Sequence, residues 1–272
     1  MKLIFNKSSI VFNKVDMMAI LSEQYGHFNR SAFESFMSSI GGEKGSIWNK
    51  ICLMYMPIFS DGTETEPLYF DVKSCSVVKP IASTDGCWER TNDANNTKVF
   101  GYKGVSTGGS QSVGIDISNM GLTTKNTCLF GTLTANPYPT SSYVWLQIST
   151  NSINDTFGIQ QRSNEYRVYN FQNASVYLTT PKSTAGFSKT SSVVMYQENG
   201  LIGINGTFGS SQDTSSVAEA NAQLFEMAGK MLPSTNTYGV IVTIQGIAKS
   251  LTHQEAEMLR IALDNLVIEM AK

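Results

Sequence analysis

The chain has 272 residues, of which 15% are charged and 41% are hydrophobic, and its formal net charge is −2. This length suffices for one large β domain with appendages, or for two small domains. The sequence contains no cluster of Lys and Arg residues that could neutralise nucleic-acid phosphates or attract an anionic membrane. The composition therefore predicts no nucleic-acid partner and no other polyionic partner.

The N-terminal sequence MKLIFNKSSIVFNK has apolar runs that polar and charged residues soon interrupt. A secretory signal peptide needs an unbroken apolar stretch of roughly 7–15 residues, and a membrane-spanning helix needs roughly 20. The longest apolar-rich stretch, residues 47–59, contains Asn49 and Lys50. We therefore expect a chain that is made in the cytoplasm, without Sec-type export and without membrane insertion.

The cysteines form no CxxC pair and have no zinc-ligand spacing, and only His27 and His253 could assist them. The sequence therefore predicts free thiols and no metal centre. The four residues are Cys52, Cys75, Cys87 and Cys128.

The N-terminal region has two parts. Residues 1–15 alternate apolar and polar side chains, which predicts one or two short strands or an extended arm. Residues 16–40 have a helical pattern, with a capping box formed by Ser31 and Glu34 and a stop at Gly41 and Gly42. The apolar face of this helix comprises Phe33, Phe36, Met37 and Ile40.

Residues 46–248 consist of short β-like runs separated by turn residues. The sequences Asn199-Gly200 and Asn205-Gly206 suit type I′ turns and predict two successive hairpins. Strands at this spacing without intervening helices favour an antiparallel sandwich. Trp48 and Trp145 lie in strand-like apolar runs and are expected in the core, whereas residues 217–231 are expected to form a short helix or a loop.

The C-terminal segment predicts a strongly amphipathic helix over residues 252–271. Thr252 and Glu255 form a second capping box, and Leu251 precedes the cap. Because the connector at residues 249–250 is short, we expect the apolar stripe to dock on the chain's own sandwich. The stripe comprises Leu259, Ala262, Leu263, Leu266 and Met270.

Two segments carry a resemblance to a known family. The ending YGVIVTIQGIAKSLTHQEAEMLRIALDNL is similar to the close of concanavalin-A-like (laminin-G-like) jelly-roll domains, in which a final strand leads into a helix on the sandwich. The segment GSIWNKICLMYMPIFSDGTETEPLYFDVKS resembles their opening. The resemblance covers roughly residues 30–272. Domains of this kind with a terminal helix occur in virion appendage proteins of tailed bacteriophages, with the crAss-like group as one candidate source.

The resemblance raises the question of hydrolysis, since glucanases of this fold carry closely spaced carboxylates on one strand. The nearest match here, Glu64 and Glu66, lies in a turn-like stretch that ends at Pro67. Neither His27 nor His253 lies in a plausible nucleophile–base arrangement, and no phosphate-binding loop is present. The sequence therefore predicts no catalytic residues and no enzymatic activity.

Glycan binding without catalysis is the remaining chemical possibility. Aromatic faces stack on sugar rings, while neighbouring amides and carboxylates bond the hydroxyls. Residues 87–93 and 164–169 have this mixture, although core or sheet-surface roles would also account for it. The loop at residues 85–96 could in addition hold Ca²⁺ through oxygen ligands, but no other cofactor is expected. The candidate glycan-binding residues are Trp88, Asn92, Asp93, Tyr166 and Tyr169.

Two functions compete on these grounds. The first is a structural virion protein of a tailed bacteriophage, a fibre or a head decoration, which presents a lectin-like sandwich to surface glycans of the host. In this hypothesis residues 1–45 anchor the protein to other capsid or tail proteins or form a dimer or trimer, and residues 46–272 form the sandwich domain. The alternative is a non-viral carbohydrate-binding or glycan-degrading protein. For the apolar face of the helix at residues 31–40, the sequence leaves open cover by an oligomer or by the chain itself.

Overall fold

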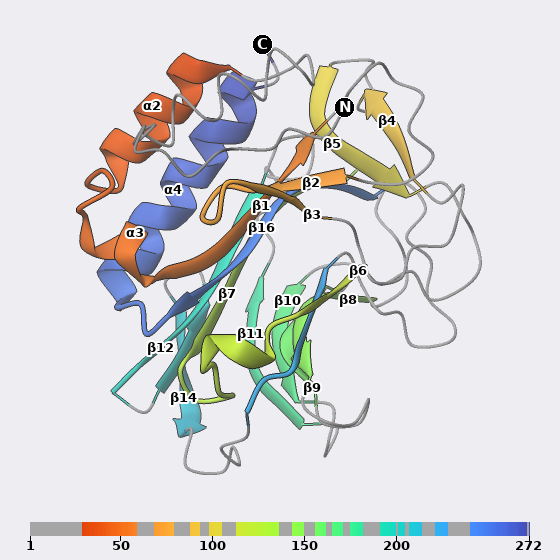
Figure 1. Ribbon diagram of the computed structural model, residues 1–272. Helices are drawn as coiled ribbons and strands as arrows, with labels where there is room; N and C mark the ends of the chain where they lie inside the picture. Colours follow the sequence, from red (N-terminus) through yellow and green to blue (C-terminus); the bar gives the residue numbers. More distant parts are fainter. Residues whose placement is uncertain are drawn as a thin grey trace.

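The computed structural model describes residues 29–58, 68–78, 88–92, 98–104, 113–135, 143–149, 156–161, 165–170, 175–181, 191–199, 201–204, 207–213, 221–227, 240–270 and 272. The paired strands of this part of the chain are antiparallel and form two sheets, and α2, α3 and α4 lie beside the larger one (Figure 1). The predicted mainly β antiparallel sandwich, closed by a C-terminal helix, is therefore confirmed.

The larger sheet has ten strands in the described residues, and the order of its main path is β14-β13-β12-β7-β16-β1-β2-β3. Off this path, β5 pairs with β16 and β4 pairs with β5. The strands are β1 (Ile51–Ile58), β2 (Leu68–Asp71), β3 (Ser76–Val78), β4 (Trp88–Asn92), β5 (Lys98–Gly104), β7 (Thr127–Ala135), β12 (Ser191–Glu198), β13 (Leu201–Ile204), β14 (Thr207–Asp213) and β16 (Val240–Lys249).

The smaller sheet has six described strands in the order β11-β10-β9-β8-β15-β6. The rings of Tyr55 on β1 and Phe225 on β15 stack with their centroids 6.4 Å apart, so the two sheets meet face to face through aromatic side chains. The strands are β6 (Val113–Asp116), β8 (Tyr143–Ser149), β9 (Thr156–Gln161), β10 (Glu165–Asn170), β11 (Ser175–Pro181) and β15 (Leu224–Met227).

The C-terminal helix α4 (His253–Met270) covers the outer face of the larger sheet, where it packs on β12, β7 and β5. Its predicted apolar stripe is buried throughout, as is Leu251 before the cap. Both predicted capping bonds form: the Glu255 N–H donates to Thr252 Oγ1 at 3.2 Å, and the Thr252 N–H donates to Glu255 Oε2 at 2.9 Å. The predicted docking of this helix on its own sandwich is confirmed.

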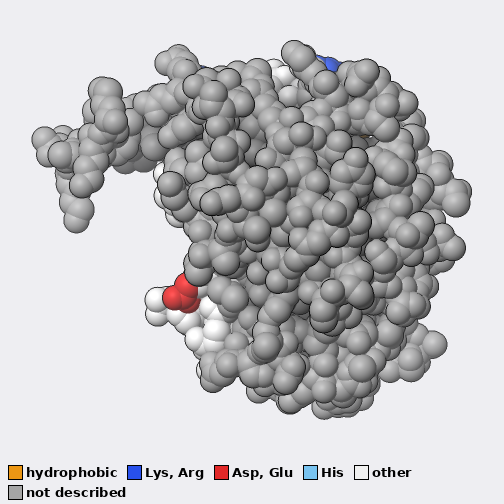
Figure 2. Space-filling model, turned by 90° about the vertical axis from the view of Figure 1, so that its right-hand side faces the viewer, with side chains coloured by type: hydrophobic (Ala, Val, Ile, Leu, Met, Phe, Trp, Pro, Cys, Tyr) orange, Lys and Arg blue, Asp and Glu red, His pale blue; other side chains and the backbone are white. Residues whose placement is uncertain are grey.

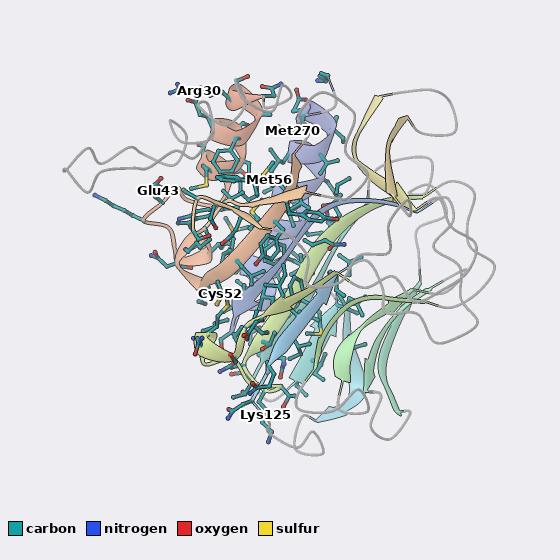
Figure 3. All side chains as sticks on the ribbon, turned by 45° about the vertical axis from the view of Figure 1, so that its right-hand side comes forward. Arg30, Glu43, Cys52, Met56, Lys125 and Met270 are labelled. Atoms are coloured by element: carbon teal, nitrogen blue, oxygen red, sulfur yellow. The ribbon has the colours of Figure 1, made fainter. Side chains whose placement is uncertain are left out.

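The N-terminal helix α2 (Arg30–Ser39) packs against α4, and the side-chain amide of Asn29 donates to the Glu269 carbonyl at 3.1 Å. Arg30 and Met270, which mark the start of α2 and the end of α4, lie at the same end of the helix layer (Figure 3). The apolar residues Phe33, Phe36 and Met37 are buried. Cover by the chain itself is therefore the alternative that the structure adopts, and no oligomer is needed to bury this face.

The expected cap of α2 is wrong by two positions. Asn29 is the N-cap, and its Oδ1 accepts hydrogen bonds from the Ala32 N–H at 3.1 Å and from the Ser31 hydroxyl at 2.9 Å. Glu34 pairs with Arg30 instead of bonding back to the cap. The helix ends where expected: Gly41 and Gly42 both adopt positive φ angles, which glycine tolerates best.

Two further expectations about local structure are corrected. Residues 46–50 form the short helix α3 (Ser46–Lys50) and not a strand, although Trp48 is buried as expected. The Lys73 ammonium lies 4.6 Å from the centroid of the Trp48 ring and donates to the Trp48 carbonyl. Within residues 217–231, where a helix or loop is expected, β15 pairs with β8 on one side and β6 on the other.

The two expected hairpins are confirmed. β12 and β13 pair in antiparallel fashion up to Glu198 and Leu201, and Asn199 between them has a φ of +51°. β13 and β14 pair in the same manner from Ile204 and Thr207. The positive φ of Asn199 suits the expected turn type, while Gly200, Asn205 and Gly206 lie outside the described residues.

Candidate functional site

Trp88 and Asn92, two of the candidate glycan-binding residues, lie at the two ends of β4. In the ladder with β5, Trp88 is opposite Gly104 and Asn92 is opposite Lys98. Because β4 pairs only with β5 among the described strands, it forms a border of the larger sheet. Asp93 lies outside the described residues, and for Trp88 and Asn92 the structure describes the backbone.

Tyr166 and Tyr169 lie on β10 of the smaller sheet, between β9 and β11. Tyr166 is opposite Gln161 and Thr180 in the two ladders, and a register shift in the β11 ladder falls between Val168 and Tyr169. Val168 is buried, which fixes this strand against the core. The structure thus brings the two tyrosines onto one strand and assigns Trp88 and Asn92 to the other sheet, so the predicted residues form two separate groups.

The other sequence candidates fall largely outside the described residues. Of the loop proposed for Ca²⁺, residues 85–87 and 93–96 are outside, as are Glu64, Glu66 and His27. Within the described residues, no group of three or more His, Cys, Asp or Glu side chains could hold a metal ion. No described helix has the length and apolar character needed to cross a bilayer.

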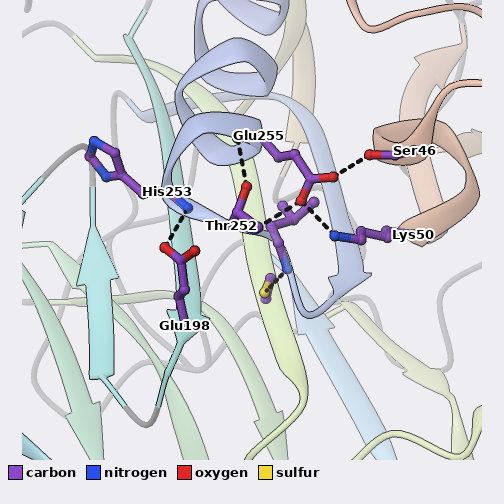
Figure 4. A network of polar contacts seen from close by, with 8 residues as sticks. Ser46, Lys50, Glu198, Thr252, His253 and Glu255 are labelled. Atoms are coloured by element: carbon purple, nitrogen blue, oxygen red, sulfur yellow. Dashed lines mark hydrogen bonds and ion pairs between the residues drawn. The ribbon is translucent and has the colours of Figure 1, made fainter.

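The start of α4 carries a polar network, of which the sequence predicts only the capping box of Thr252 and Glu255 (Figure 4). The Lys50 ammonium, at the end of α3, lies 2.6 Å from Glu255 Oε2. The Ser46 hydroxyl donates to the other carboxylate oxygen. Partial burial alone raises the pKa of Glu255, but the hydrogen bonds from Lys50, Ser46 and Thr252 outweigh it and lower that pKa to about 2. Glu255 is therefore an ionised anchor that fastens α3 to α4.

His253 lies beside this anchor and joins α4 to β12. Its backbone N–H donates to Glu198 Oε2 at 3.0 Å, and its Nδ1 lies 2.6 Å from the hydroxyl of Tyr196. Burial, together with the charges of Glu257 and Glu198, raises the pKa of Tyr196 to about 12. The tyrosine is therefore a neutral hydrogen-bonding group at neutral pH. The capping-box pattern predicts the local role of Glu255, but no local pattern indicates that Lys50 contacts Glu255 or that Tyr196 contacts His253.

Cys128, on β7, lies next to the residue that precedes the cap of α4. The Leu251 N–H donates to its sulfur at 3.3 Å, and complete burial raises the pKa of its thiol to about 11. A thiol in this state is a poor nucleophile, because the thiolate is the reactive form. The described cysteines, Cys52, Cys75 and Cys128, form no disulfide, as expected.

A second polar group lies on the inner face of the larger sheet. Tyr55 is opposite Gln245 on β16 and opposite Asp71 on β2, so all three share one face. Burial and the Asp71 charge raise the pKa of Tyr55 above its ordinary range. The Asp71 carboxylate accepts backbone bonds from Met54 and Lys73. Neither polar atom of the buried Gln245 side chain has a hydrogen-bond partner among the described residues.

On the face shown in Figure 2, the described acidic side chains lie at the left edge and the described basic side chains lie at the upper edge, far from them. The described polar groups mostly complete the fold: they cap α4, join it to the sheet and turn the chain after β2. The residue types suited to ligand binding therefore remain those on β4 and β10.

Comparison with known proteins supports the fold. No protein-family model and no curated protein matches the chain. Among solved structures, it is similar to Trypanosoma rangeli sialidase in complex with sialic acid, with 12% identity over 92% of this chain and a TM-score of 0.53. It is also similar to the binding domain of botulinum neurotoxin serotype D (12% identity, 83% of this chain, TM-score 0.53).

A further similar structure is the serotype D ligand-binding domain in complex with N-acetylneuraminic acid, with 14% identity over 83% of this chain and a TM-score of 0.52. The chain spans 38% of the sialidase chain and about half of the neurotoxin domain, 52%. At these identities the likeness shows the fold alone, a mainly β antiparallel sandwich that agrees with the expected jelly-roll class.

Proposed function

We propose that this protein is a non-enzymatic glycan-binding β-sandwich protein. The observation that carries the proposal is the fold likeness over most of the chain to a sialidase and a toxin ligand-binding domain, both described in complex with a sialic acid. Two stretches suited to sugars lie on strands of this fold: the stretch around Trp88 on β4 and the stretch around Tyr166 on β10. Aromatic residues next to amides and carboxylates supply both stacking and hydrogen bonding to a sugar ring.

The proposed ligand class is an acidic sugar. Each of the two stretches contains an arginine, Arg90 on β4 and Arg167 on β10. A guanidinium group matches the geometry of a carboxylate with two parallel N–H donors, and a neutral sugar offers no such acceptor. Sialic acids carry a carboxylate, so a site with one of these arginines would favour a sialylated glycan over the same glycan without its terminal sugar.

The binding test compares pairs of glycans that differ only in a terminal N-acetylneuraminic acid. We expect the full chain to bind the sialylated member at least about tenfold more tightly, measured by calorimetry or by glycan array. Loss of binding in Trp88→Ala would assign the site to β4 and loss in Tyr169→Ala would assign it to β10, since Tyr169 and the buried Val168 fall on opposite faces of that strand. Trp88→Phe, which keeps an aromatic face, should retain most of the binding of a site on β4. A wild-type protein that binds no glycan of either class would refute the proposal.

The biological setting we propose is the virion of a tailed bacteriophage, in which the protein is a structural fibre or head decoration protein. The proposal is supported by the sequence resemblance to sandwich domains with a terminal helix. Since α2 is covered by α4, the contact with other virion proteins is assigned to residues 1–28. Mass spectrometry of purified particles should detect the full chain, and a chain without residues 1–28 should fold but fail to join particles. Absence of the full chain from particles would refute this setting.

The absence of hydrolytic activity is part of the same proposal. It rests on the lack of a carboxylate strand in the sequence. The protein should release neither reducing ends nor free sialic acid from a broad panel of glycans. Release that a single Asp or Glu substitution abolishes would show that the protein is an enzyme, whether or not it also binds glycans.

A further inference from the structure

The outward side of α4 carries a regular row of exposed residues. The described residues from 253 to 272 that do not belong to this row are all buried or half-buried, and Ala271 lies outside the described residues. The spacing along the row alternates between four and three residues, which is the spacing of the seam of a coiled coil. The row comprises Gln254, Met258, Ile261, Asn265, Ile268 and Lys272.

Three of these residues are large and apolar. Their exposed fractions are 41% for Met258, 52% for Ile261 and 46% for Ile268. A helix on the surface of a soluble protein normally turns charged and polar residues to water. From Gln254 to Ile268 the row contains no charged residue, and Asn265 is its only polar residue after Gln254 in this interval.

The neighbouring helix α2 shows the usual pattern in the same layer. Its exposed residues are Arg30, Ser31, Glu34, Ser35, Ser38 and Ser39. Both helices bury one face against the same chain, but only α4 turns large apolar side chains outward. The apolar row is therefore a property of α4 and not of the helix layer as a whole.

The row is also held rigidly in place. Asp264 accepts a hydrogen bond from the Ser192 N–H at 2.7 Å, which ties the middle of α4 to β12. The Glu269 carbonyl accepts from Asn29, and the Glu255 carboxylate is fixed by Lys50, so both ends are held as well. A partner would therefore meet a preformed surface and would lose little conformational entropy in α4 on binding.

We infer that this row is an interface with a second copy of the chain, in which two α4 helices pack against each other through Met258, Ile261, Asn265 and Ile268. A two-fold interface brings the same patch of both copies together, so the patch must suit itself. The uncharged stretch from Gln254 to Ile268 brings no like charges into contact. An asparagine amide both donates and accepts, so Asn265 can bond its counterpart, and one such residue in an apolar seam sets the register.

The charges that flank the row are largely compensated within α4. Arg260 pairs with Glu257 at 3.1 Å and with Asp264 at 3.3 Å. The surface therefore offers few unpaired charges to a strongly charged partner, whereas the uncharged row of a second copy can pack against it. This interface stands apart from the glycan-binding proposal, which concerns β4 and β10.

The size of the contact sets the expected strength. A helix of 18 residues is about 27 Å long at a rise of about 1.5 Å per residue. A single helix pair buries less than the roughly 1,200–2,000 Å² of a standard stable interface. The dimer should therefore depend on protein concentration and dissociate on dilution.

The test is sedimentation or light scattering of the full chain over a concentration range of about 1 to 500 μM. We expect a monomer–dimer equilibrium that Ile261→Glu weakens at least about tenfold, because it places two carboxylates in the seam. The matched control is Ser38→Glu, which adds the same charge to the exposed face of α2 and should leave the equilibrium unchanged. Melting curves at low concentration should agree for all three proteins, because both sites are exposed.

Three results would overturn the inference. One is a wild-type chain that stays monomeric over the whole range. Another is a dimer that Ile261→Glu leaves intact. The third is a full chain that stays monomeric while a chain without residues 1–28 dimerises. In that case the N-terminal segment, and not a second copy, would cover the row in the full chain. An Asn265→Cys variant adds a direct reading, because oxidation should link two copies only if the rows face each other.

Discussion

The Lys50 ammonium lies 2.6 Å from Oε2 of Glu255, although 205 residues separate the two in sequence. The pair joins the short helix that precedes β1 to the first turn of the last helix. Glu255 also completes the capping box with Thr252, so one carboxylate serves a local and a long-range contact. The contact helps to hold the beginning and the end of the described fold together.

Glu255→Gln should destabilise the protein by about 1 kcal/mol at neutral pH through the loss of the ion pair with Lys50, because a glutamine amide can still accept the Thr252 N–H and keep the cap. The folded pKa of Glu255, about 2, lies below the ordinary carboxyl value of 4.5. Its ionisation therefore contributes stability above the ordinary pKa, and that contribution is lost as the pH falls from about 5 towards 2. Urea unfolding at several pH values should show the difference between wild type and variant shrinking over this range.

Glu34→Gln is the matched control, since it removes an exposed ion pair with Arg30 on α2. Exposed pairs contribute little, so its effect should stay within about 0.5 kcal/mol at every pH. A difference between Glu255→Gln and wild type that does not change with pH would contradict the assigned role.

Gln245→Met should raise the free energy of unfolding by about 1–3 kcal/mol, because a buried amide without partners among the described residues costs desolvation energy. Methionine keeps a similar shape and adds no polar atom. The opposite sign is expected for Thr243→Val, since the Thr243 hydroxyl donates to the Thr132 carbonyl at 2.8 Å. If Gln245→Met is destabilising in chemical denaturation, an ordered water that satisfies the amide is the better account.

Gly246→Ala should destabilise the sheet by about 1–3 kcal/mol or more through overpacking. A Cβ at this position would lie 2.3 Å from Cζ of Phe130 and 2.5 Å from the Leu53 carbonyl oxygen. The ring can turn, but the backbone oxygen is fixed in the ladder. Asn199→Gly, at a positive φ of +51°, provides the comparison and should be neutral or stabilising in thermal melts.

Cys128 should resist alkylation by iodoacetamide at pH 8 in the folded protein. Its thiol is buried and its pKa is raised to about 11, so little thiolate forms and the reagent has no access. The half-buried Cys75 should react faster. Peptide mass spectrometry with a urea-treated sample as the reference gives the order, and equal labelling of the two cysteines in the native protein would disprove this expectation.

Local patterns predicted the parts of the fold that local chemistry determines. The Asn-Gly turns, the cap at Thr252 and the buried stripe of α4 each follow from residues close in sequence. The predicted helix cap at Ser31 is wrong because Asn29, two residues earlier, is an equally good cap and its side-chain oxygen accepts the hydrogen bond from the Ala32 N–H. Two candidate capping residues this close in sequence cannot be ranked without the tertiary contact between Asn29 and Glu269.

Long-range contacts explain the other differences. Leu224–Met227 has a composition that suits a helix, but ladders with β6 and β8 on both sides hold it as a strand. Trp48 lies in an apolar run that suits a strand, yet α3 places it under Lys73. The candidate glycan-binding residues share suitable side-chain types within each stretch, but residue type does not indicate that β4 and β10 belong to different sheets.

The position of β16 has a consequence for how the chain is made. This strand lies between β7 and β1, both of which leave the ribosome much earlier. Until residues 240–249 emerge, the edges of β7 and β1 that pair with β16 in the native sheet have unpaired backbone groups, and the native strand order does not let these two strands pair with each other. Such edges attract other chains. Synthesis should therefore require chaperone protection until its final stage, and a stop codon before β16 should yield an insoluble product and not a smaller folded domain.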